Sequence, residues 1–317
     1  MILDKLGSIF GEGGKLMEML STLPGAVSLG IIWGIMAIGV YLTYRILDIA
    51  DLTVDGSFAT GAAVCAVMLI GGRNVYAALA VAIAAGMLAG LVTGLLHTFF
   101  GIPAILSGIL TQLMLWTVNL KIMGGANKTV SARRLPVLIT SMRNTEAIIT
   151  LLIVAAILII VLYWFFGTAR GCSIRATGCN LKMSRAQGIN TSFNQVLGLM
   201  LSNGIVALSG ALFSQYQGTA DINNGRGAIV IGLAAVIIGE ALLSKIARNF
   251  AVRLLSVIIG GIVYYVLYQV IIELGLDTDF LKMLTALLVA VFLGLPHLKK
   301  NYLPAKKQKG GKKFVKN

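Results

Sequence analysis

Residues 167–190 read GTARGCSIRATGCNLKMSRAQGIN, between two apolar segments at residues 148–166 and 193–216. Apolar runs of about 20 residues are typical of membrane-spanning helices, so the stretch between them is expected to emerge into water. Short loops rich in lysine and arginine mark the cytoplasmic side of a membrane. We interpret this stretch, the basic island, as a folded cytoplasmic elbow that contacts another protein; the alternative is a loop that only fixes orientation. Its basic residues are Arg170, Arg175, Lys182 and Arg185, and it contains no acid.

The composition of the whole chain agrees with a membrane protein. Of 317 residues, 57% are hydrophobic and only 12% are charged, against about 25% in globular proteins. We predict an all-α polytopic membrane protein with about nine transmembrane helices, in a range of eight to ten. One of these segments is expected to be broken or re-entrant. The net charge of +14 comes from loops and a tail, which favours orientation and contact with anionic membrane lipid over nucleic acid.

The chain divides into three predicted parts. Residues 1–24 form an N-terminal interfacial segment, residues 25–298 form the transmembrane domain, and residues 299–317 form a basic cytoplasmic tail. Alternation of the spans places the basic island, the loop at 245–253 and the tail on one side, which puts the C-terminus in the cytoplasm. The basic connection at 124–146 then falls outside. The exact helix count and the side of the N-terminus therefore remain open.

The first predicted span covers residues 26–47, and an acidic stretch containing Asp51 and Asp55 follows it. The next apolar segment, residues 58–70, is too short to cross a bilayer alone. The polar residues before it are therefore expected to enter the membrane and to line a cavity. Asp55 either caps a short helix at residues 56–58 or lines a pathway, and the two roles are compatible. The remaining predicted spans are residues 76–100, 104–123, 148–166, 193–216, 228–243, 254–274 and 281–295.

Two spans carry polar seams. In the segment 104–123, Gln112, Trp116 and Asn119 fall at i, i+4 and i+7 and so share one helix face. In the segment 193–216, Ser202 and Ser209 belong to a seven-residue repeat beside several glycines, which favours close helix packing over substrate contact. The predicted substrate pathway consists of Asp55, Ser57, Gln112, Trp116 and Asn119.

No catalytic chemistry is evident in the sequence. A phosphate-binding G-x-x-x-x-G-K-[ST] motif is absent, and His97 and His297 are too isolated to suggest a metal site. We therefore expect no enzyme activity and no metal or other cofactor in this chain. Ion-coupled carriers usually place ionisable groups deep within spans. In this chain only Asp51, Asp55 and Glu240 could lie within a span. This argues against an ion-coupled carrier, which stays as an alternative.

Three stretches resemble the permease subunits of bacterial ABC importers of the branched-chain amino acid and ribose type. They are residues 49–63 (IADLTVDGSFATGAA), residues 232–240 (GLAAVIIGE) and the basic island. The resemblance extends over about residues 28–295. Glu240 departs from the family's more common glycine. The run LTVDGS at 52–57 is most similar to a subgroup paired with lipoprotein-type binding proteins, some of them linked to tryptophan or other aromatic amino acids. The island positions that match the family pattern are Arg175, Ala176, Gly178, Asn180, Ala186, Gly188, Ile189 and Asn190.

This resemblance implies a multi-pass protein of a bacterial plasma membrane that imports a small solute by alternating access. The solute is expected to be an amino acid, aromatic or branched-chain, with a sugar or nucleoside as the alternative. The implied partners are a second permease chain in a homodimer, two ATPase subunits that bind ATP and Mg, and an extracellular solute-binding (lipo)protein. The residues expected to couple to the ATPase are Glu240, Ser244, Lys245, Arg248, Asn249, Arg170, Arg175, Lys182 and Arg185.

Overall fold

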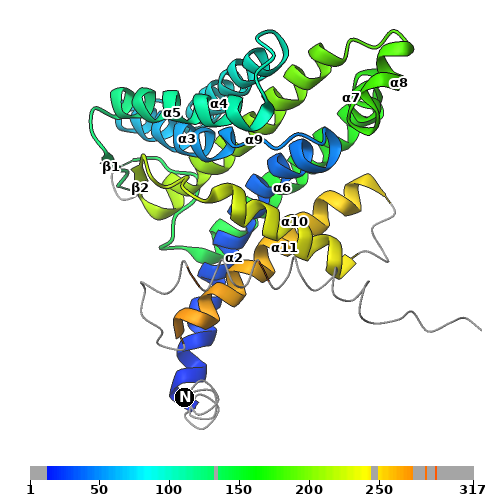
Figure 1. Ribbon diagram of the computed structural model, residues 1–317. Coiled ribbons are helices and arrows are strands. Elements are labelled where there is room, and N and C mark those ends of the chain that lie inside the picture. The colour runs from blue at the N-terminus through cyan, green and yellow to red at the C-terminus, as the bar shows by residue number, and fades with distance from the viewer. Residues whose placement is uncertain (1–12, 132–134, 244–248, 274–282, 284–289, 291–317) are drawn as a thin grey trace, which may run out of the picture.

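The computed structural model describes residues 13–131, 135–243, 249–273, 283 and 290, and these residues form an almost entirely helical molecule (Figure 1). Seven described helices are long and apolar enough to cross a membrane, and α10 is a shorter apolar helix. The all-α polytopic class is thereby confirmed. In chain order the elements are α2 (Gly13–Tyr41), the π-helix η1 (Leu42–Ile46), α3 (Thr53–Ile70), α4 (Val75–Thr98), α5 (Ala104–Met123), β1 (Asn127–Thr129), α6 (Asn144–Gly167), α7 (Ala169–Cys179), α8 (Leu181–Ala186), α9 (Thr191–Gln217), β2 (Thr219–Asp221), α10 (Ala228–Leu243) and α11 (Phe250–Glu273).

The predicted segments correspond closely to these helices. The fourth and seventh predicted spans have the same bounds as α5 and α10, and the others differ by a few residues at their ends. The first span is longer than expected, because α2 already begins at Gly13. The ninth predicted span at 281–295, the tail at 299–317 and residues 1–12 fall outside the described residues, apart from the single positions 283 and 290. The total count and the domain boundaries therefore stay predictions.

The molecule has two distinct ends. The helices α7 and α8 form one of them, the island end, and the antiparallel pair β1–β2 lies at the other, the strand end (Figure 1). The helices α2 and α11 run antiparallel, since Thr22 near the start of α2 donates to Glu273 at the end of α11 over 3.0 Å. At the island end, Arg45 pairs with Glu240 at the end of α10. The basic island and the connection at 124–146 thus lie at opposite ends, as the alternation of spans predicts.

The break before α3 is present but is shorter than predicted. The helix begins at Thr53 rather than at residue 58 and has 18 residues, so the non-helical backbone is limited to residues 47–52. The buried carboxylate of Asp51 accepts the backbone N–H of Thr53 over 2.9 Å and satisfies a donor of the first turn. Leu52 packs against Gly108 in the second turn of α5. The part of the break next to α3 is therefore packed inside the protein, whereas Asp48 and Ala50 earlier in the break are exposed.

The helix α9 crosses the centre of the molecule and packs closely on its neighbours. A Cβ atom on Gly61 of α3 would collide with the backbone of Ala207, and one on Gly210 of α9 would collide with the backbone of Phe58. The hydroxyls of Ser202 and Ser209 donate to backbone carbonyls of α2 over 2.8 and 2.6 Å. The packing interpretation of this polar seam is thus confirmed for both serines.

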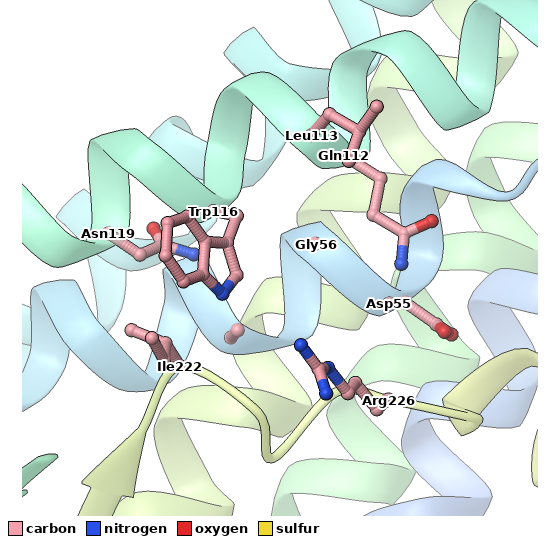
Figure 2. Close-up of a pocket in the computed structure, with 9 residues that line it drawn as sticks. Asp55, Gly56, Gln112, Leu113, Trp116, Asn119, Ile222 and Arg226 are labelled. Carbon is pink, nitrogen blue, oxygen red and sulfur yellow. The ribbon is translucent and has the colours of Figure 1, made fainter. Parts of the chain in front are cut away.

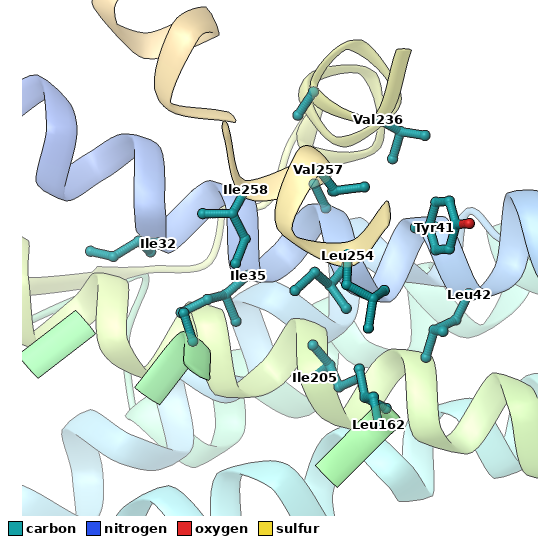
Figure 3. Packing of buried hydrophobic residues seen from close by; sticks show 14 of the residues in the cluster. Ile32, Ile35, Tyr41, Leu42, Leu162, Ile205, Val236, Leu254, Val257 and Ile258 are labelled. Carbon is teal, nitrogen blue, oxygen red and sulfur yellow. The ribbon is translucent and has the colours of Figure 1, made fainter. Parts of the chain in front are cut away.

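A large apolar core joins α2, α6, α9, α10 and α11 (Figure 3). Ile35 of α2 and Leu254 and Val257 of α11 are almost fully buried within it. In contrast, only 17% of the most apolar window of α6 is buried in this chain. An apolar helix with that little internal burial is suited to contact with lipid.

Candidate functional site

A cavity of about 250 Å³ lies between α3, α5 and the segment that joins β2 to α10 (Figure 2). It contains four of the five residues predicted for the substrate pathway. The prediction that Gln112, Trp116 and Asn119 share one face of a helix is correct, since all three line this cavity from α5. We call it the pathway pocket. Its lining consists of Asp55, Gly56, Ala59, Gln112, Leu113, Trp116, Asn119, Ile222 and Arg226.

Gly56 sets the distance between the two helices of the pathway pocket. A Cβ atom there would lie 2.9 Å from Cδ1 of Leu115 and 3.2 Å from Cα of Gln112. Only a residue without a side chain lets α5 approach α3 this closely. The early turns of α3 therefore form one wall of the cavity, and the middle of α5 forms the wall opposite.

Asp55 caps a helix, although not the one proposed from the sequence. Its carboxylate accepts the backbone N–H groups of Gly227 and Ile229 over 2.9 and 3.0 Å. These donors belong to the start of α10, so Asp55 stabilises the N-terminus of that helix through hydrogen bonds and the helix dipole. The cap predicted at residues 56–58 is wrong. Asp55 also lines the pathway pocket, so capping and lining coexist in one residue.

Several polar side chains of the pathway pocket, among them Asn119 and Arg226, have no hydrogen-bond partner among the described residues. Asn119 is only 1% exposed, and neither its amide nitrogen nor its amide oxygen makes a hydrogen bond. The guanidinium of Arg226 makes no hydrogen bond or ion pair within the part of the chain that the structure describes. Figure 2 shows the Trp116 ring and the Arg226 guanidinium directed toward the same space from opposite sides. Sequence reasoning missed Arg226, although an isolated arginine just before an apolar segment was a usable signal.

Ser57 does not reach the pathway pocket. It is fully buried, and its hydroxyl donates to Oδ1 of Asn203 over 2.6 Å. The Nδ2 atom of Asn203 in turn donates to the Asp51 carboxylate over 2.7 Å. Beside this triplet, the hydroxyls of Thr53, Thr93 and Thr111 are linked at 2.7 and 2.9 Å. We call these residues the buried polar belt: Asp51, Thr53, Ser57, Thr93, Thr111 and Asn203.

The residues of the basic island that match the family pattern have structural roles. Asn180 and Asn190 cap α8 and α9 with their side chains, and Gly188 has a φ of +77°. A Cβ atom on Gly178 would collide with the carbonyl oxygen of Ile46, so α7 rests directly on the end of η1. The amide of Asn194 donates to hydroxyls of α7 over 2.7 and 2.9 Å. The island is thus folded and attached to the membrane-spanning helices.

Three of the four basic side chains in the island contact its framework. The guanidinium of Arg175 lies 4.4 Å from the ring centroid of Phe250 and 5.4 Å from that of Phe166. Arg170 lies over the Phe193 ring, and Arg185 donates to the Thr191 hydroxyl over 2.9 Å. Lys182 is exposed. These cation–π contacts and hydrogen bonds hold α7 and α8 against α6, α9 and α11.

The other predicted coupling residues lie around the C-terminal end of α10. Glu240 forms an ion pair of 3.0 Å with Arg45, and Asn249 is exposed immediately before α11. Ser244, Lys245 and Arg248 fall outside the described residues. Among the residues that the structure does describe, no three His, Cys, Asp or Glu side chains are grouped as a metal site would require.

Residues 23–295 match the protein family described as branched-chain amino acid transport system / permease component, and the chain belongs to this family. It is therefore the membrane-spanning permease subunit of an ABC importer, a transport subunit embedded as a multi-pass protein in a bacterial plasma membrane. The resemblance found in the basic island and in residues 49–63 and 232–240 is thereby confirmed.

Individual relatives agree with this assignment. The chain is 37% identical over 281 residues to the tyrosine transport system permease protein of Clostridioides difficile (strain R20291), covering 88% of this chain and 92% of the relative. It is 31% identical over 270 residues to an uncharacterized protein of Rickettsia prowazekii (strain Madrid E), covering 84% and 94%. It is 27% identical over 269 residues to the autoinducer 2 import system permease protein LsrC of Yersinia pseudotuberculosis, covering 82% and 73%. No solved structure matches the chain significantly.

Proposed function

We propose that this permease imports an amino acid with an aromatic or apolar side chain, delivered by an extracellular binding (lipo)protein. The observation that carries the proposal is the pathway pocket, in which an indole ring, two amides and a guanidinium surround one cavity. A pocket of this kind suits a solute with one apolar part and one polar, charged part. The 37% identity to a tyrosine transport permease supports the same solute class.

The pathway is proposed to lie between two copies of the chain in a homodimer. The outer face of α5 supports this arrangement, because Leu113 is 64% and Trp116 43% exposed next to the partly buried amide of Gln112. A face that combines an amide and an indole beside an open cavity is poorly suited to the lipid interior. The middle of α6, where Ile153, Ile157 and Ile160 are exposed, is the better lipid contact.

The two functional regions are connected by α10. Its N-terminus is held by Asp55 at the pathway pocket, and Glu240 near its C-terminus is held by Arg45 at the island end. A helix of 16 residues fixed at both ends transmits a displacement as a rigid body. Movement of the segment after Glu240 is therefore proposed to shift Gly227 and Arg226 and to reshape the pocket.

Two separate ATPase subunits, which bind ATP and Mg, are proposed to supply that movement from the island end. The proposed contact surface consists of the exposed parts of the basic island together with the loop after α10. Its described members are Glu240, Asn249, Arg170, Arg175, Lys182 and Arg185, and Ser244, Lys245 and Arg248 complete it from outside the described residues.

Reconstitution tests this function. The chain is incorporated into liposomes with its ATPase and its binding protein, and uptake of radiolabelled L-tyrosine is measured with and without ATP on the cytoplasmic side. We expect uptake that requires all three components. Uptake by the chain alone under a sodium or proton gradient would instead favour an ion-coupled carrier. Uptake of a sugar without uptake of any amino acid would contradict the proposed solute class.

A charge reversal tests the coupling surface separately. The double variant Arg170→Glu and Lys182→Glu is expected to release the ATPase during co-purification, because both side chains are exposed at the island end. The matched control is Lys121→Glu, which makes the same type of change on an exposed lysine at the C-terminal end of α5, the strand end. Equal retention of the ATPase by the double variant and the control would remove the island from the coupling surface.

A further inference from the structure

We infer that Arg226 binds the carboxylate of the transported solute, while the Trp116 ring holds its apolar part and the Asn119 amide binds a polar group. This assignment rests on the proposed function, which names the solute class, and it adds the residues that recognise the solute. Arg226 lies in the segment between β2 and α10 and was not among the residues predicted for the pathway.

The charge balance of the pathway pocket leads to Arg226. Asp55 and Arg226 are the charged residues in its described lining. Both carboxylate oxygens of Asp55 already accept backbone N–H groups of α10, and the N-terminus of that helix compensates its negative charge. Arg226 has no counter-ion among the described residues, and it is exposed at the mouth of the cavity, where a solute can reach it. A guanidinium without a counter-ion, at the edge of a cavity, is a strong and planar donor set for a carboxylate.

Asn119 gives independent support for a bound ligand. Burying an amide without hydrogen bonds is unfavourable, and native proteins contain few such groups. Asn119 is 1% exposed and both of its polar atoms lack partners. The side chain lines the cavity one turn beyond Trp116 on α5, with both polar atoms covered in this structure, and we assign it to a polar group of a solute that rests on the indole ring.

The position of Arg226 also explains how recognition is linked to transport. The preceding Gly225 packs so closely on Asp55 that a Cβ atom would collide with the carbonyl oxygen of Asp55. The following Gly227 donates to the Asp55 carboxylate. Arg226 is therefore fixed between two contacts to α3 and directly precedes α10. A displacement of α10 moves the guanidinium relative to Trp116 and weakens its hold on the solute.

Variants of Arg226 test this inference in the reconstituted importer, with the binding protein unchanged and saturated with L-tyrosine. Arg226→Ala is expected to lower ATP-dependent uptake at least about tenfold, since a hydrogen bond to a charged group is lost. Assembly with the ATPase and the stimulated rate of ATP hydrolysis are expected to stay within about twofold of wild type. The control Arg73→Ala removes an exposed arginine from the turn between α3 and α4 and is expected to transport normally. Equal uptake by Arg226→Ala and wild type would overturn the assignment.

A conservative pair keeps the test informative where Arg226→Ala does not assemble. Arg226→Lys retains the positive charge and Arg226→Gln retains only hydrogen-bonding capacity. We expect the lysine variant to take up L-tyrosine several-fold faster than the glutamine variant. Equal rates, or a faster glutamine variant, contradict carboxylate binding. A wild-type importer that moves a neutral sugar and no amino acid refutes the proposed function itself, whereas tyrosine uptake that is insensitive to Arg226 refutes only this inference.

Asn119→Leu distinguishes ligand binding from a structural role. The change removes two unsatisfied polar atoms at nearly constant volume, so the free chain in detergent should unfold at the same temperature as wild type or higher. Uptake of L-tyrosine is expected to fall at least about fivefold because the solute loses a hydrogen-bond partner. If the variant is clearly less stable than wild type, the Asn119 amide has a structural role. If the variant transports L-tyrosine normally, the amide does not bind the solute.

Discussion

The buried polar belt and the pathway pocket lie on different faces of the first turns of α3, and their asparagine side chains differ in hydrogen bonding. In the belt, the amide nitrogen of Asn203 donates to Asp51, and its amide oxygen accepts from the Ser57 hydroxyl. In the pocket, Asn119 is buried equally well, but neither its amide nitrogen nor its amide oxygen makes a hydrogen bond. Two asparagines with the same chemistry and the same burial thus differ only in whether the protein supplies their partners. A complete network stabilises the fold, and an incomplete one indicates a ligand.

The contrast extends to the two carboxylates of this region. Asp51 is enclosed by hydrogen bonds to Thr53 and Asn203 within the belt. Asp55 lines the pocket but directs its oxygens to the start of α10. The oxygens of both acids thus have structural hydrogen bonds, although the sequence analysis placed Asp55 in the substrate pathway and named Asp51 among the acids that could lie within a span. The groups left for a solute are the less conspicuous Asn119, Gln112 and Arg226.

The largest expected effect is on stability, from removal of the central amide of the belt. Asn203→Leu removes the hydrogen bond from Asn203 to the buried Asp51 carboxylate, which keeps the one from the Thr53 N–H, and it leaves the Ser57 hydroxyl without its Asn203 partner. We expect the free energy of unfolding to fall by about 3 kcal/mol, because a buried charged group loses a hydrogen bond. Denaturant unfolding in detergent measures it. The matched control is Asn119→Leu, which should cost nothing; equal losses in both variants would abolish the distinction between the two regions.

A smaller loss is expected where α3 and α9 cross next to the belt. Gly210→Ala places a methyl group against the backbone of Phe58, and separation of the helices would stretch the hydrogen bonds of Asn203. Overpacking of this kind costs about 2 kcal/mol. Gly125→Ala is the control, since nothing lies within 4 Å of a Cβ atom at that position. An unchanged unfolding temperature for Gly210→Ala would show that the crossing adjusts without strain.

Much of the fold could be predicted from local sequence. Helix existence was predictable because apolar runs such as 104–123 must be helical in a membrane. The common face of Gln112, Trp116 and Asn119 was predictable from helical periodicity alone. The start of α3 was predicted five residues late, because the side chain of Asp51, and not an apolar residue, begins the helix.

The remaining features depend on contacts between distant segments. Nothing in the local sequence indicates that Asp55 caps α10, a helix more than 170 residues further along the chain. The same long-range contact brings Arg226 to the pathway pocket, which explains why it was missed. Ser57 was assigned to the pocket by its proximity to Asp55 in sequence, but residues two apart on a helix point in different directions. Its partner Asn203 comes from α9.

Asp55 offers a change of intermediate size that acts on both regions. Asp55→Asn keeps one acceptor oxygen and loses the charge, so α10 loses part of its cap and of the favourable dipole interaction. We expect a loss of about 1 kcal/mol in the free energy of unfolding. Uptake of L-tyrosine should fall more than stability suggests, because Gly227 and Arg226 lose their fixed position. Thermal unfolding and uptake are measured on the same preparation, and a variant that transports at the wild-type rate argues against Asp55 as the anchor of α10.

The smallest effect is expected for the ion pair between Arg45 and Glu240, in which both charges have a partner but neither side chain is buried. Arg45 and Glu240 lie 3.0 Å apart, yet their side chains are 57% and 33% exposed. Exposed ion pairs contribute about 0.2–1 kcal/mol, and salt screens them. A double-mutant cycle with Arg45→Ala and Glu240→Ala should therefore give a coupling free energy of about 0.5 kcal/mol that decreases at high ionic strength. A coupling free energy several times larger would mean that a hydrogen-bonded partner stabilises these helix contacts strongly even without burial. The difference between the belt and the pocket would then depend only on whether each polar group has a partner, and not on how deeply it is buried.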